Sequence, residues 1–251
     1  MTRSYLDISP ELARHLRLVM TDVDGTLTSD GEYFSPLVME AVSHLKEKGL
    51  IIGLVSGRTL PRLKKVASLL ATNGPLIAEN GGVAQLKFDT PTLDLGYSRQ
   101  PALVALSRLK TAFPGVIKER EDNNSRVVDV TIRADRVTLE ELRKAAPDVQ
   151  ISDSGYMVHI MAPGISKGTT LVKMLGQISK EPLSPTEVMV FGDSPTDISL
   201  FRHFPNSVLI HNPNLSPDQI EAMEGVASYQ SNFFVDRGFS QVVEHITRLC
   251  Q

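Results

Sequence analysis

The chain has 251 residues, which is enough for one large globular domain or two smaller ones with a substantial buried core. Hydrophobic residues make up 41% of the sequence and charged residues 22%, as is ordinary for a soluble globular protein, and the net charge is −3. The charges are dispersed, so no basic face points to nucleic acid, and no apolar run approaches the ~20 residues of a membrane span.

The first part of the sequence alternates between apolar strands and amphipathic helices. Ser35 and Pro36 form a helix start, with serine as the N-cap and proline at the first helical position, and Gly49 ends that helix. Another helix is predicted at 60–70, and strands are predicted at 18–20, 50–55 and 75–78. This order favours a parallel sheet that is covered by helices.

The regular alternation of strands and helices stops after Gly81 and Gly82. Residues 127–132 alternate between apolar and polar side chains, which is typical of an antiparallel sheet with one open face. Thr138 and Glu141 have the spacing of a capping box, which predicts a short helix after Thr138. Further strands are predicted at 83–88 and 155–161, and a helix at 101–112. This part of the chain therefore has the pattern of a small α+β unit.

Strands and helices alternate again from Lys167 onward. Helices are predicted at 168–178, 197–203 and 238–249, with one more starting at Ser216, and strands at 187–191 and 208–210. We therefore expect an α/β protein with a Rossmann-like parallel-sheet core. Residues 1–83 and 161–251 would form this core domain, and residues 84–160 an α+β domain inserted into it.

Reactive residue types follow the ends of several predicted strands. Asp22 and Asp24 come directly after the first apolar run, and Asp193 follows the strand at 187–191. Ligands in open α/β sheets bind at the carboxyl ends of the strands, so these groups are expected to converge. Paired carboxylates at a tight turn suit a divalent cation beside a nucleophile. Other reactive types at strand ends or helix starts are Ser56, Gly57, Arg58, Asn80, Lys167 and Asp197.

Each of these residues also has an ordinary structural explanation. Asp22 and Asp24 are types found in turns and helix caps, and Lys167 is a type usually found on a solvated surface. An EF-hand calcium loop is excluded, because Thr26 and Leu27 stand where it needs an acid or Asn and a glycine. The joint occurrence of the reactive types at one expected sheet edge is what indicates a site.

Four segments in chain order resemble the motifs of the haloacid dehalogenase (HAD) superfamily of phosphatases: residues 22–28, 56–58, 167–168 and 192–197. The segment 79–82 and the position of the insertion resemble the Cof-type branch, whose inserted cap domain is of the C2B type. Asn212 and the segment 236–239 are similar to sucrose-phosphatase-like and archaeal phosphoglycolate-phosphatase-like members. The resemblance covers nearly the whole chain after residue 16.

The resemblance implies Mg²⁺-dependent hydrolysis of a phosphate monoester. Asp22 would attack phosphorus and form an aspartyl phosphate, and Asp24 would protonate the leaving group and then activate water. A magnesium ion and an ammonium group would offset the repulsion between a carboxylate and a dianionic phosphate. The residues implied at the metal are Asp22, Asp24 through its backbone carbonyl, Asp193 and Asp197. Those implied at the phosphate and substrate are Ser56, Gly57, Arg58, Lys167 and Asn212.

The motifs do not identify the substrate. The polar segment 118–126 and His159 belong to the expected cap, where each either reaches the cleft or lies on a solvated surface. A polar cap with few aromatic residues suits a small sugar phosphate or phosphoglycolate. His211 is a further candidate, although a lone histidine at a strand end is more often structural. Thr196 departs from the family pattern, because many relatives have asparagine there.

Two other functions use similar residues. A phospho-accepting Mg²⁺-binding switch, like a response-regulator receiver, also has aspartates at strand ends and a lysine, but receivers are about half this length and lack a cap. A phosphotransferase of the phosphomannomutase kind resembles this chain in its cap type. For both the phosphatase and the phosphotransferase the expected binding partner is a small phosphate ester. The protein is expected to be a monomer or a homodimer.

Cys250 is the only cysteine, which excludes an internal disulfide and a cysteine-built zinc site. Residues 1–17 carry charges throughout and lack the apolar segment of a signal peptide. We therefore expect a cytoplasmic protein with no membrane partner.

Overall fold

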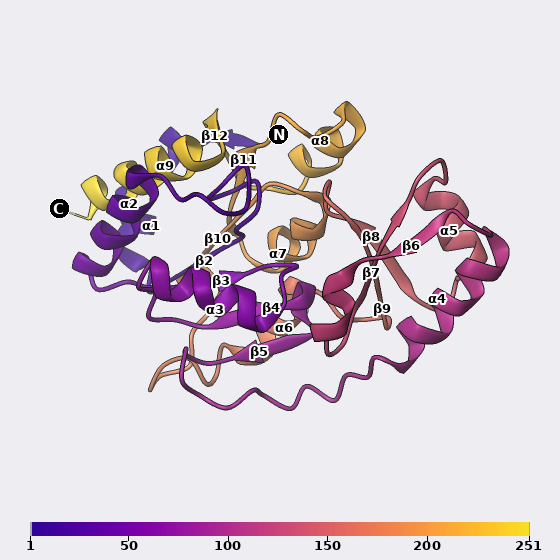
Figure 1. The fold of residues 1–251 in the computed structure, drawn as a ribbon. Coiled ribbons are helices and arrows are strands. Elements are labelled where there is room, and N and C mark those ends of the chain that lie inside the picture. The colour runs from indigo at the N-terminus through magenta and orange to yellow at the C-terminus, as the bar shows by residue number, and fades with distance from the viewer. Residues whose placement is uncertain (1, 251) are drawn as a thin grey trace.

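The computed structural model describes residues 2–250, whose strands form two separate β-sheets (Figure 1). The larger sheet has eight strands in the order β1-β12-β11-β10-β2-β3-β4-β5, and all neighbours are parallel except β4 and β5. Its strands are β1 (Arg3–Ser4), β2 (Leu18–Thr21), β3 (Ile51–Val55), β4 (Leu76–Ala78), β5 (Val83–Gln85), β10 (Val188–Gly192), β11 (Asn206–His211) and β12 (Tyr229–Phe234). The predicted α/β fold with a parallel core sheet is confirmed.

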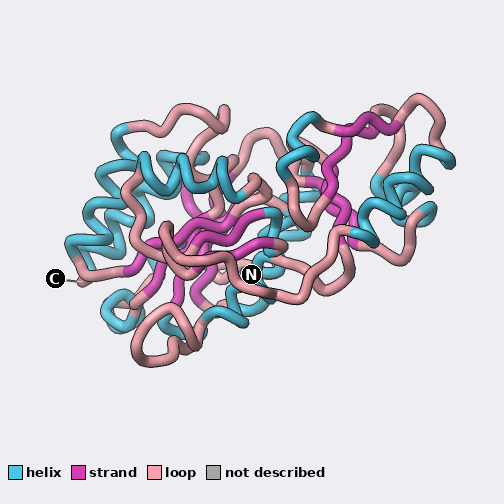
Figure 2. Tube along the Cα trace, turned by 60° about the horizontal axis from the view of Figure 1, so that its bottom comes forward, coloured by secondary structure: helices cyan, strands magenta, loops and turns pink. Residues whose placement is uncertain are grey.

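Helices cover both faces of the larger sheet (Figure 2). One face packs against α1 (Pro10–His15), α2 (Pro36–Glu47), α3 (Leu60–Leu69) and α9 (Val235–Leu249). The other packs against α6 (Lys167–Met174), α7 (Ile198–His203) and α8 (Pro217–Glu224). Strand β2 shows why both faces need a cover, since Val19 points into the first layer while Leu18 and Met20 point into the second.

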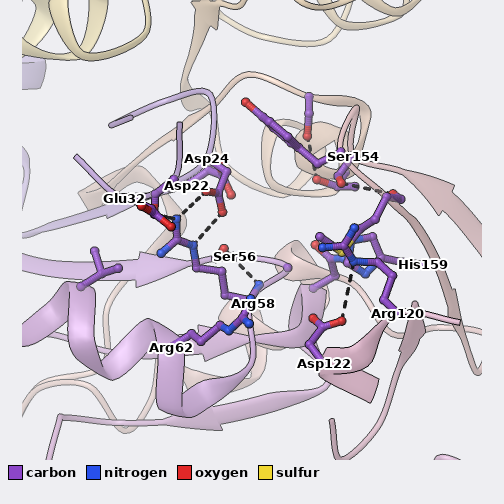
Figure 3. A pocket seen from close by; sticks show the side chains of 18 of the residues that line it. Asp22, Asp24, Glu32, Ser56, Arg58, Arg62, Arg120, Asp122, Ser154 and His159 are labelled. Carbon is purple, nitrogen blue, oxygen red and sulfur yellow. Dashed lines mark hydrogen bonds and ion pairs between the residues drawn. The ribbon is translucent and has the colours of Figure 1, made fainter. Parts of the chain in front are cut away.

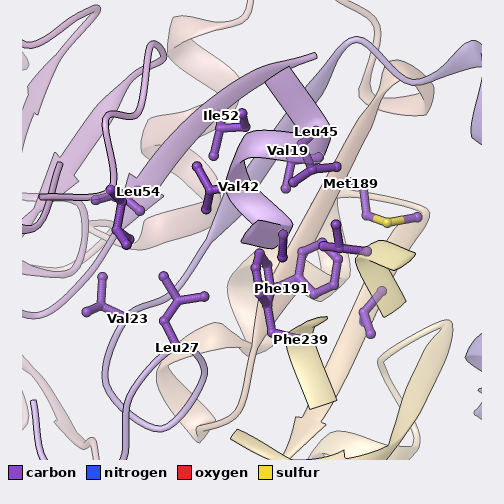
Figure 4. Close-up of a cluster of buried hydrophobic side chains, with 14 of the residues drawn as sticks. Val19, Val23, Leu27, Val42, Leu45, Ile52, Leu54, Met189, Phe191 and Phe239 are labelled. Carbon is purple, nitrogen blue, oxygen red and sulfur yellow. The ribbon is translucent and has the colours of Figure 1, made fainter. Parts of the chain in front are cut away.

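The first layer forms a large apolar core beneath the central strands (Figure 4). Phe191 of β10 meets Phe239 of α9 edge to face, with 5.0 Å between the ring centroids. Val19 and Ile52 of the neighbouring strands are fully buried in the same cluster. Burial of this kind fixes the central strands, and with them the loops that leave their carboxyl ends.

The smaller sheet is antiparallel and has the order β6-β7-β9-β8. Its strands and the two helices that pack on it are β6 (Ile117–Glu119), β7 (Val130–Ala134), β8 (Gln150–Asp153), β9 (Val158–Met161), α4 (Gln100–Ala112) and α5 (Leu139–Ala145). These elements share a hydrophobic cluster of their own. A cap domain at 84–160 remains our proposal, and Ala84 and Gln85 of β5 still pair with β4 in the larger sheet.

Several elements differ from the sequence predictions. The strands β1, β6, β8 and β12 and the helix α1 were not predicted, because they are short or, like β12, mostly polar. The predicted helix 168–178 ends at Met174, and the terminal helix begins at Val235 rather than at Gly238. Within residues 2–250, no helix combines the length and the apolar character that crossing a bilayer requires.

Candidate active site

Reactive side chains follow five adjacent parallel strands of the larger sheet at their carboxyl ends. Asp22 follows β2, Ser56 follows β3, and Asp193 follows β10. Asn80 and Asn212 come after β4 and β11. The strand order β11-β10-β2-β3-β4 therefore brings residues from distant parts of the chain to one edge.

Lys167 lies between two carboxylates at this edge. Its Nζ atom is 2.7 Å from Asp22 Oδ1 and 2.7 Å from Asp197 Oδ1, and the lysine is only 1% exposed. The second Asp197 oxygen accepts hydrogen bonds from the backbone N–H groups of Asp193 and Ser194, at 3.1 and 3.0 Å. Asp197 thus orients Lys167 on one side and the loop after β10 on the other.

Asp193 is fully buried and is held from two directions. Thr26 Oγ1 donates to its Oδ1 at 2.9 Å, and Asn212 Nδ2 donates to its Oδ2 at 2.6 Å. Gly25, with φ of +91°, lies so close that a β-carbon on it would be 2.2 Å from Asp193 Oδ2. The loop after β2 therefore requires glycine at this position to approach Asp193.

Asp22 and Asp193 are buried near the ammonium group of Lys167, and the pKa values of both are raised. Burial raises the pKa of Asp22 well above its ordinary value, Lys167 opposes that rise, and Asp197 and Asp193 add to it. Burial and the neighbouring Asp197 raise the pKa of Asp193 to about 7. Burial lowers the pKa of Lys167, but Asp197 and Asp22 outweigh burial and raise it. The cluster therefore has an excess of negative charge that a second cation would relieve.

Asp22, Asp193 and Asp197 fit a divalent cation. Each offers one carboxylate oxygen, and these atoms lie within 4.8 Å of one another. All three residues are buried, and oxygen ligands of this kind are those that Mg²⁺ prefers. The carboxylate of Asp24 is outside this cluster, which agrees with a role for its backbone carbonyl rather than its side chain at a metal.

Asp24 instead forms a bidentate ion pair with Arg58. Arg58 Nε donates to Asp24 Oδ2 at 2.8 Å, and Arg58 Nη2 donates to Asp24 Oδ1 at 2.6 Å. Arg58 also donates to the carbonyl oxygen of Gly31. The predicted substrate-binding arginine thus holds the side chain that we expect to carry the proton, and fixes the direction of its carboxyl group.

A cavity of about 700 Å³ opens beside these residues. Asp22, Asp24 and Ser56 line it on one side, and Arg120, Asp122 and His159 line it on the other (Figure 3). Further lining residues that were predicted at the site are Gly57, Arg58 and Lys167. The cavity thus lies between the carboxyl edge of the larger sheet and the smaller sheet.

Four candidate residues are not among those that line the cavity: the proposed metal ligands Asp193 and Asp197, and Asn212 and His211. Asn212 is not among the lining residues, and its amide donates to Asp193, so we propose that it positions this carboxylate rather than phosphate. His211 also does not line the cavity, and its ring lies edge-on to Phe234 at 6.1 Å between centroids. This geometry favours a structural role for His211.

The polar segment 118–126 contributes to the cavity through Arg120, Asp122 and Arg126, and β9 contributes His159. From the sequence, the segment 118–126 and His159 could either reach the cleft or lie on a solvated surface, and no role was assigned to Asn80. The signal for Asn80 is its place after β4 in a strand-end motif, where it adopts a left-handed φ of 52°.

Comparisons with known proteins find relatives over most of the chain. A family model described as haloacid dehalogenase-like hydrolase matches residues 19–102 and 104–220. A phosphoglycolate phosphatase of Methanospirillum hungatei is 30% identical over 232 residues, which cover 91% of this chain and 95% of that protein.

Solved structures give the same result for the fold. The crystal structure of protein 0175 of Thermoplasma acidophilum superposes with a TM-score of 0.78 at 24% identity, and the match covers 93% of this chain and 99% of that one. A sugar phosphatase of HAD subclass IIB superposes with a TM-score of 0.70 at 20% identity, covering 91% of this chain and 98% of that one.

Proposed function

Because the chain belongs to the haloacid dehalogenase-like hydrolase family, we propose that it is a Mg²⁺-dependent phosphatase that works through an aspartyl phosphate on Asp22. The observation that carries this proposal is the ion pair of Asp22 with the buried Lys167 at the base of a cavity. Lys167 contacts one oxygen of Asp22, which leaves the other free to attack. The substrate would be a small phosphate monoester such as a sugar phosphate or phosphoglycolate.

In the first step, Asp22 forms a bond to phosphorus while the bond from phosphorus to the ester oxygen breaks. The leaving oxygen takes a proton from Asp24, which lines the cavity close by. In the second step, Asp24 takes a proton from a water molecule as that water attacks phosphorus. The bond to Asp22 then breaks, which frees phosphate and restores both aspartates.

The other motif residues would bind the phosphoryl group. Ser56 lies at the carboxyl end of β3, and the loop of Gly57 follows it into the cavity. Lys167 supplies a positive charge opposite the transferring oxygens. Asp22, Asp193 and Asp197, with the carbonyl of Asp24, would hold Mg²⁺, which when bound supplies further charge neutralisation for the phosphoryl group.

A phosphate-release screen over sugar phosphates, phosphoglycolate and nucleotides, with and without Mg²⁺, tests this function. Mg²⁺-dependent release of inorganic phosphate is the expected result. Conversion of a sugar 6-phosphate to its 1-phosphate without release would instead identify a phosphotransferase. Stable self-phosphorylation without turnover would identify a phospho-accepting switch. We also propose a cytoplasmic location, with which the free thiol of Cys250 is consistent.

Replacing Asp24 by asparagine is expected to lower kcat by about 10²–10⁴-fold, because the amide cannot donate the proton that the leaving group needs. The loss should be smaller with p-nitrophenyl phosphate, whose leaving group needs little protonation. Steady-state kinetics on that ester and on an alkyl phosphate measure the difference. A loss below about tenfold on the alkyl phosphate would contradict the acid role, whereas an equal loss on both esters would mean that the second step, in which Asp24 acts as the base, limits the rate with both.

Adding Mg²⁺ is expected to raise the thermal stability of the protein, because the ion relieves repulsion between Asp22, Asp193 and Asp197. At a free ion concentration of 100 times Kd the gain is about 2.7 kcal/mol. Thermal unfolding in EDTA and in graded Mg²⁺ measures it. Asp193→Asn should lose the gain, whereas the exposed Asp89→Asn should keep it. The same gain in Asp193→Asn would rule out this ligand set.

A further inference from the structure

The turn that follows β4 holds a buried glutamate with an unusual backbone. Glu79 is fully buried, and its φ of 50° lies in the left-handed region that favours glycine. Asn80 and Gly81 continue in the same region, with φ of 52° and 108°. A glutamate costs more free energy here than a glycine would, through its backbone and through the burial of a carboxylate. The contacts of that carboxylate account for the residue type.

The carboxylate of Glu79 binds the backbone that leads into β7, which we call the docking segment (residues 126–129). It accepts hydrogen bonds from the N–H groups of Val127 at 2.9 and 3.1 Å, Val128 at 2.8 Å and Asp129 at 3.0 Å. No cationic side chain within residues 2–250 forms an ion pair with Glu79. Burial and Asp129 raise the pKa of Glu79, and the three N–H groups oppose that rise. Consecutive N–H groups of the smaller sheet thus form a nest for this charge.

The docking segment contacts the larger sheet in two further ways. Arg126 Nη1 donates to the carbonyl oxygen of Gly57 at 2.9 Å, and Asp129 accepts from the same nitrogen at 2.7 Å. Val128 is 3% exposed and belongs to the apolar core beneath the larger sheet. A β-carbon on Gly82 would lie 2.8 Å from Val128 Cβ, so only glycine permits this approach. Polar and apolar contacts therefore converge on the docking segment.

The turn of Glu79 also contacts two parts of the candidate active site. The backbone N–H of Asn80 donates to the carbonyl oxygen of Ser56 at 3.0 Å. The carbonyl oxygen of Gly81 accepts a hydrogen bond from α6, the helix that begins with Lys167, at 2.7 Å. One turn therefore connects the loop after β3, the helix of the buried lysine and, through the Glu79 side chain, the smaller sheet.

We propose that Glu79 is a positioning residue, which fixes the smaller sheet on the loop of Ser56 and so determines the shape of the cavity between the two sheets. The docking segment leads into β7, which pairs with β9, and these elements bring Arg126 and His159 to the cavity. Without the carboxylate, three N–H groups lose their acceptor, and we expect the smaller sheet to occupy a wider range of positions. The consequence for turnover rests on the proposed function, whereas the position of the smaller sheet does not.

Distances between two spin labels test this role without any substrate. In a Cys250→Ser background, labels are attached to Glu40→Cys on α2 and to Ser107→Cys on α4, which are both exposed positions. Figure 1 shows these helices at opposite ends of the molecule, one beside each sheet. Double electron–electron resonance should give one narrow distance distribution while Glu79 is present, because its carboxylate holds the two sheets together.

Two variants of Glu79 should broaden that distribution. Glu79→Gln keeps the size of the side chain but turns an NH₂ group toward N–H donors. Glu79→Gly removes the carboxylate and suits the left-handed backbone, so it should fold even if other truncations do not. Glu140→Gln, which changes an exposed glutamate of α5, is the control and should keep the narrow distribution. An unchanged distribution in both Glu79 variants would overturn the positioning role.

Kinetics of Glu79→Gln give the consequence for turnover. We expect kcat/KM to fall by about ten- to a hundredfold on the sugar phosphate that the phosphate-release screen ranks highest, because its leaving group extends to the smaller sheet. Acetyl phosphate, whose leaving group is small, should be hydrolysed nearly as before, because the backbone bonds of the turn to Ser56 and α6 remain. Equal relative losses on both esters would reduce Glu79 to a structural role. If no ester of the screen releases phosphate, the proposed phosphatase fails, and the label distances still decide the role of Glu79.

Discussion

Asp22→Asn is expected to abolish turnover, with kcat lower by about 10⁴-fold or more, and to abolish any trapped phospho-enzyme. The amide has the size of the carboxylate but cannot form the aspartyl phosphate. The measurements are phosphate release over long incubations and acid-quench labelling of the protein with a phosphorylated substrate. Both must be lost together, because the proposed intermediate is formed on the replaced atom.

The fold should survive Asp22→Asn. Burial raises the pKa of Asp22, so a neutral amide replaces a group whose charge is costly in this place. A thermal unfolding temperature at or above that of the unmodified protein would confirm that the loss is chemical. Asp89→Asn, which changes an exposed aspartate in the same way, is the control and should retain full activity. Activity close to the unmodified level in Asp22→Asn would end the nucleophile proposal.

Lys167→Met is expected to cost both stability and activity. Methionine fills similar space but leaves Asp22 and Asp197 buried without their cation. Breaking a buried pair in this way typically costs about 3–5 kcal/mol, and loss of one stabilising group for the transferring oxygens costs about 10²–10³ in kcat. Urea unfolding in EDTA and steady-state kinetics give the two values.

Lys167→Met also tests whether lost charge neutralisation explains the loss of stability. Mg²⁺ should restore part of the lost stability, because it also neutralises the carboxylates, but it should not restore kcat. Lys173→Met, an exposed lysine on the same helix, is the control and should change little. A stability loss below about 1 kcal/mol in Lys167→Met would mean that its ion pairs do not hold the cluster.

The positions at the carboxyl edge could be predicted because each follows a strand with a clear apolar pattern. Asp22, Ser56 and Asp193 come directly after the central strands β2, β3 and β10, so the order of elements and the rules for parallel sheets bring them together. The same rules predicted the α/β class. Strands away from the centre gave weaker patterns: β12, which lies between β1 and β11, reads Tyr-Gln-Ser-Asn-Phe-Phe and is mostly polar before its last two residues.

The side of the cavity that the smaller sheet contributes, which includes His159, could not be predicted in the same way. The contact of His159 with Asp129 depends on the antiparallel pairing of β9 with β7, in which His159 stands opposite Thr131. Arg58 illustrates a second limit, because nothing local to its motif shows that its guanidinium binds Asp24, 34 positions earlier. Long-range register and side-chain direction decide such contacts, and a single sequence carries little information on either.

The strand order has a consequence for how the protein is made. In the larger sheet β2 lies between β3 and β10, but β10 is synthesised about 170 residues after β2. While the ribosome is still adding the intervening residues, β2 presents an unpaired, apolar edge of the kind that recruits other chains. The nascent chain therefore has most need of protection before residue 188 emerges, and a chain cut short of β10 would be prone to aggregation.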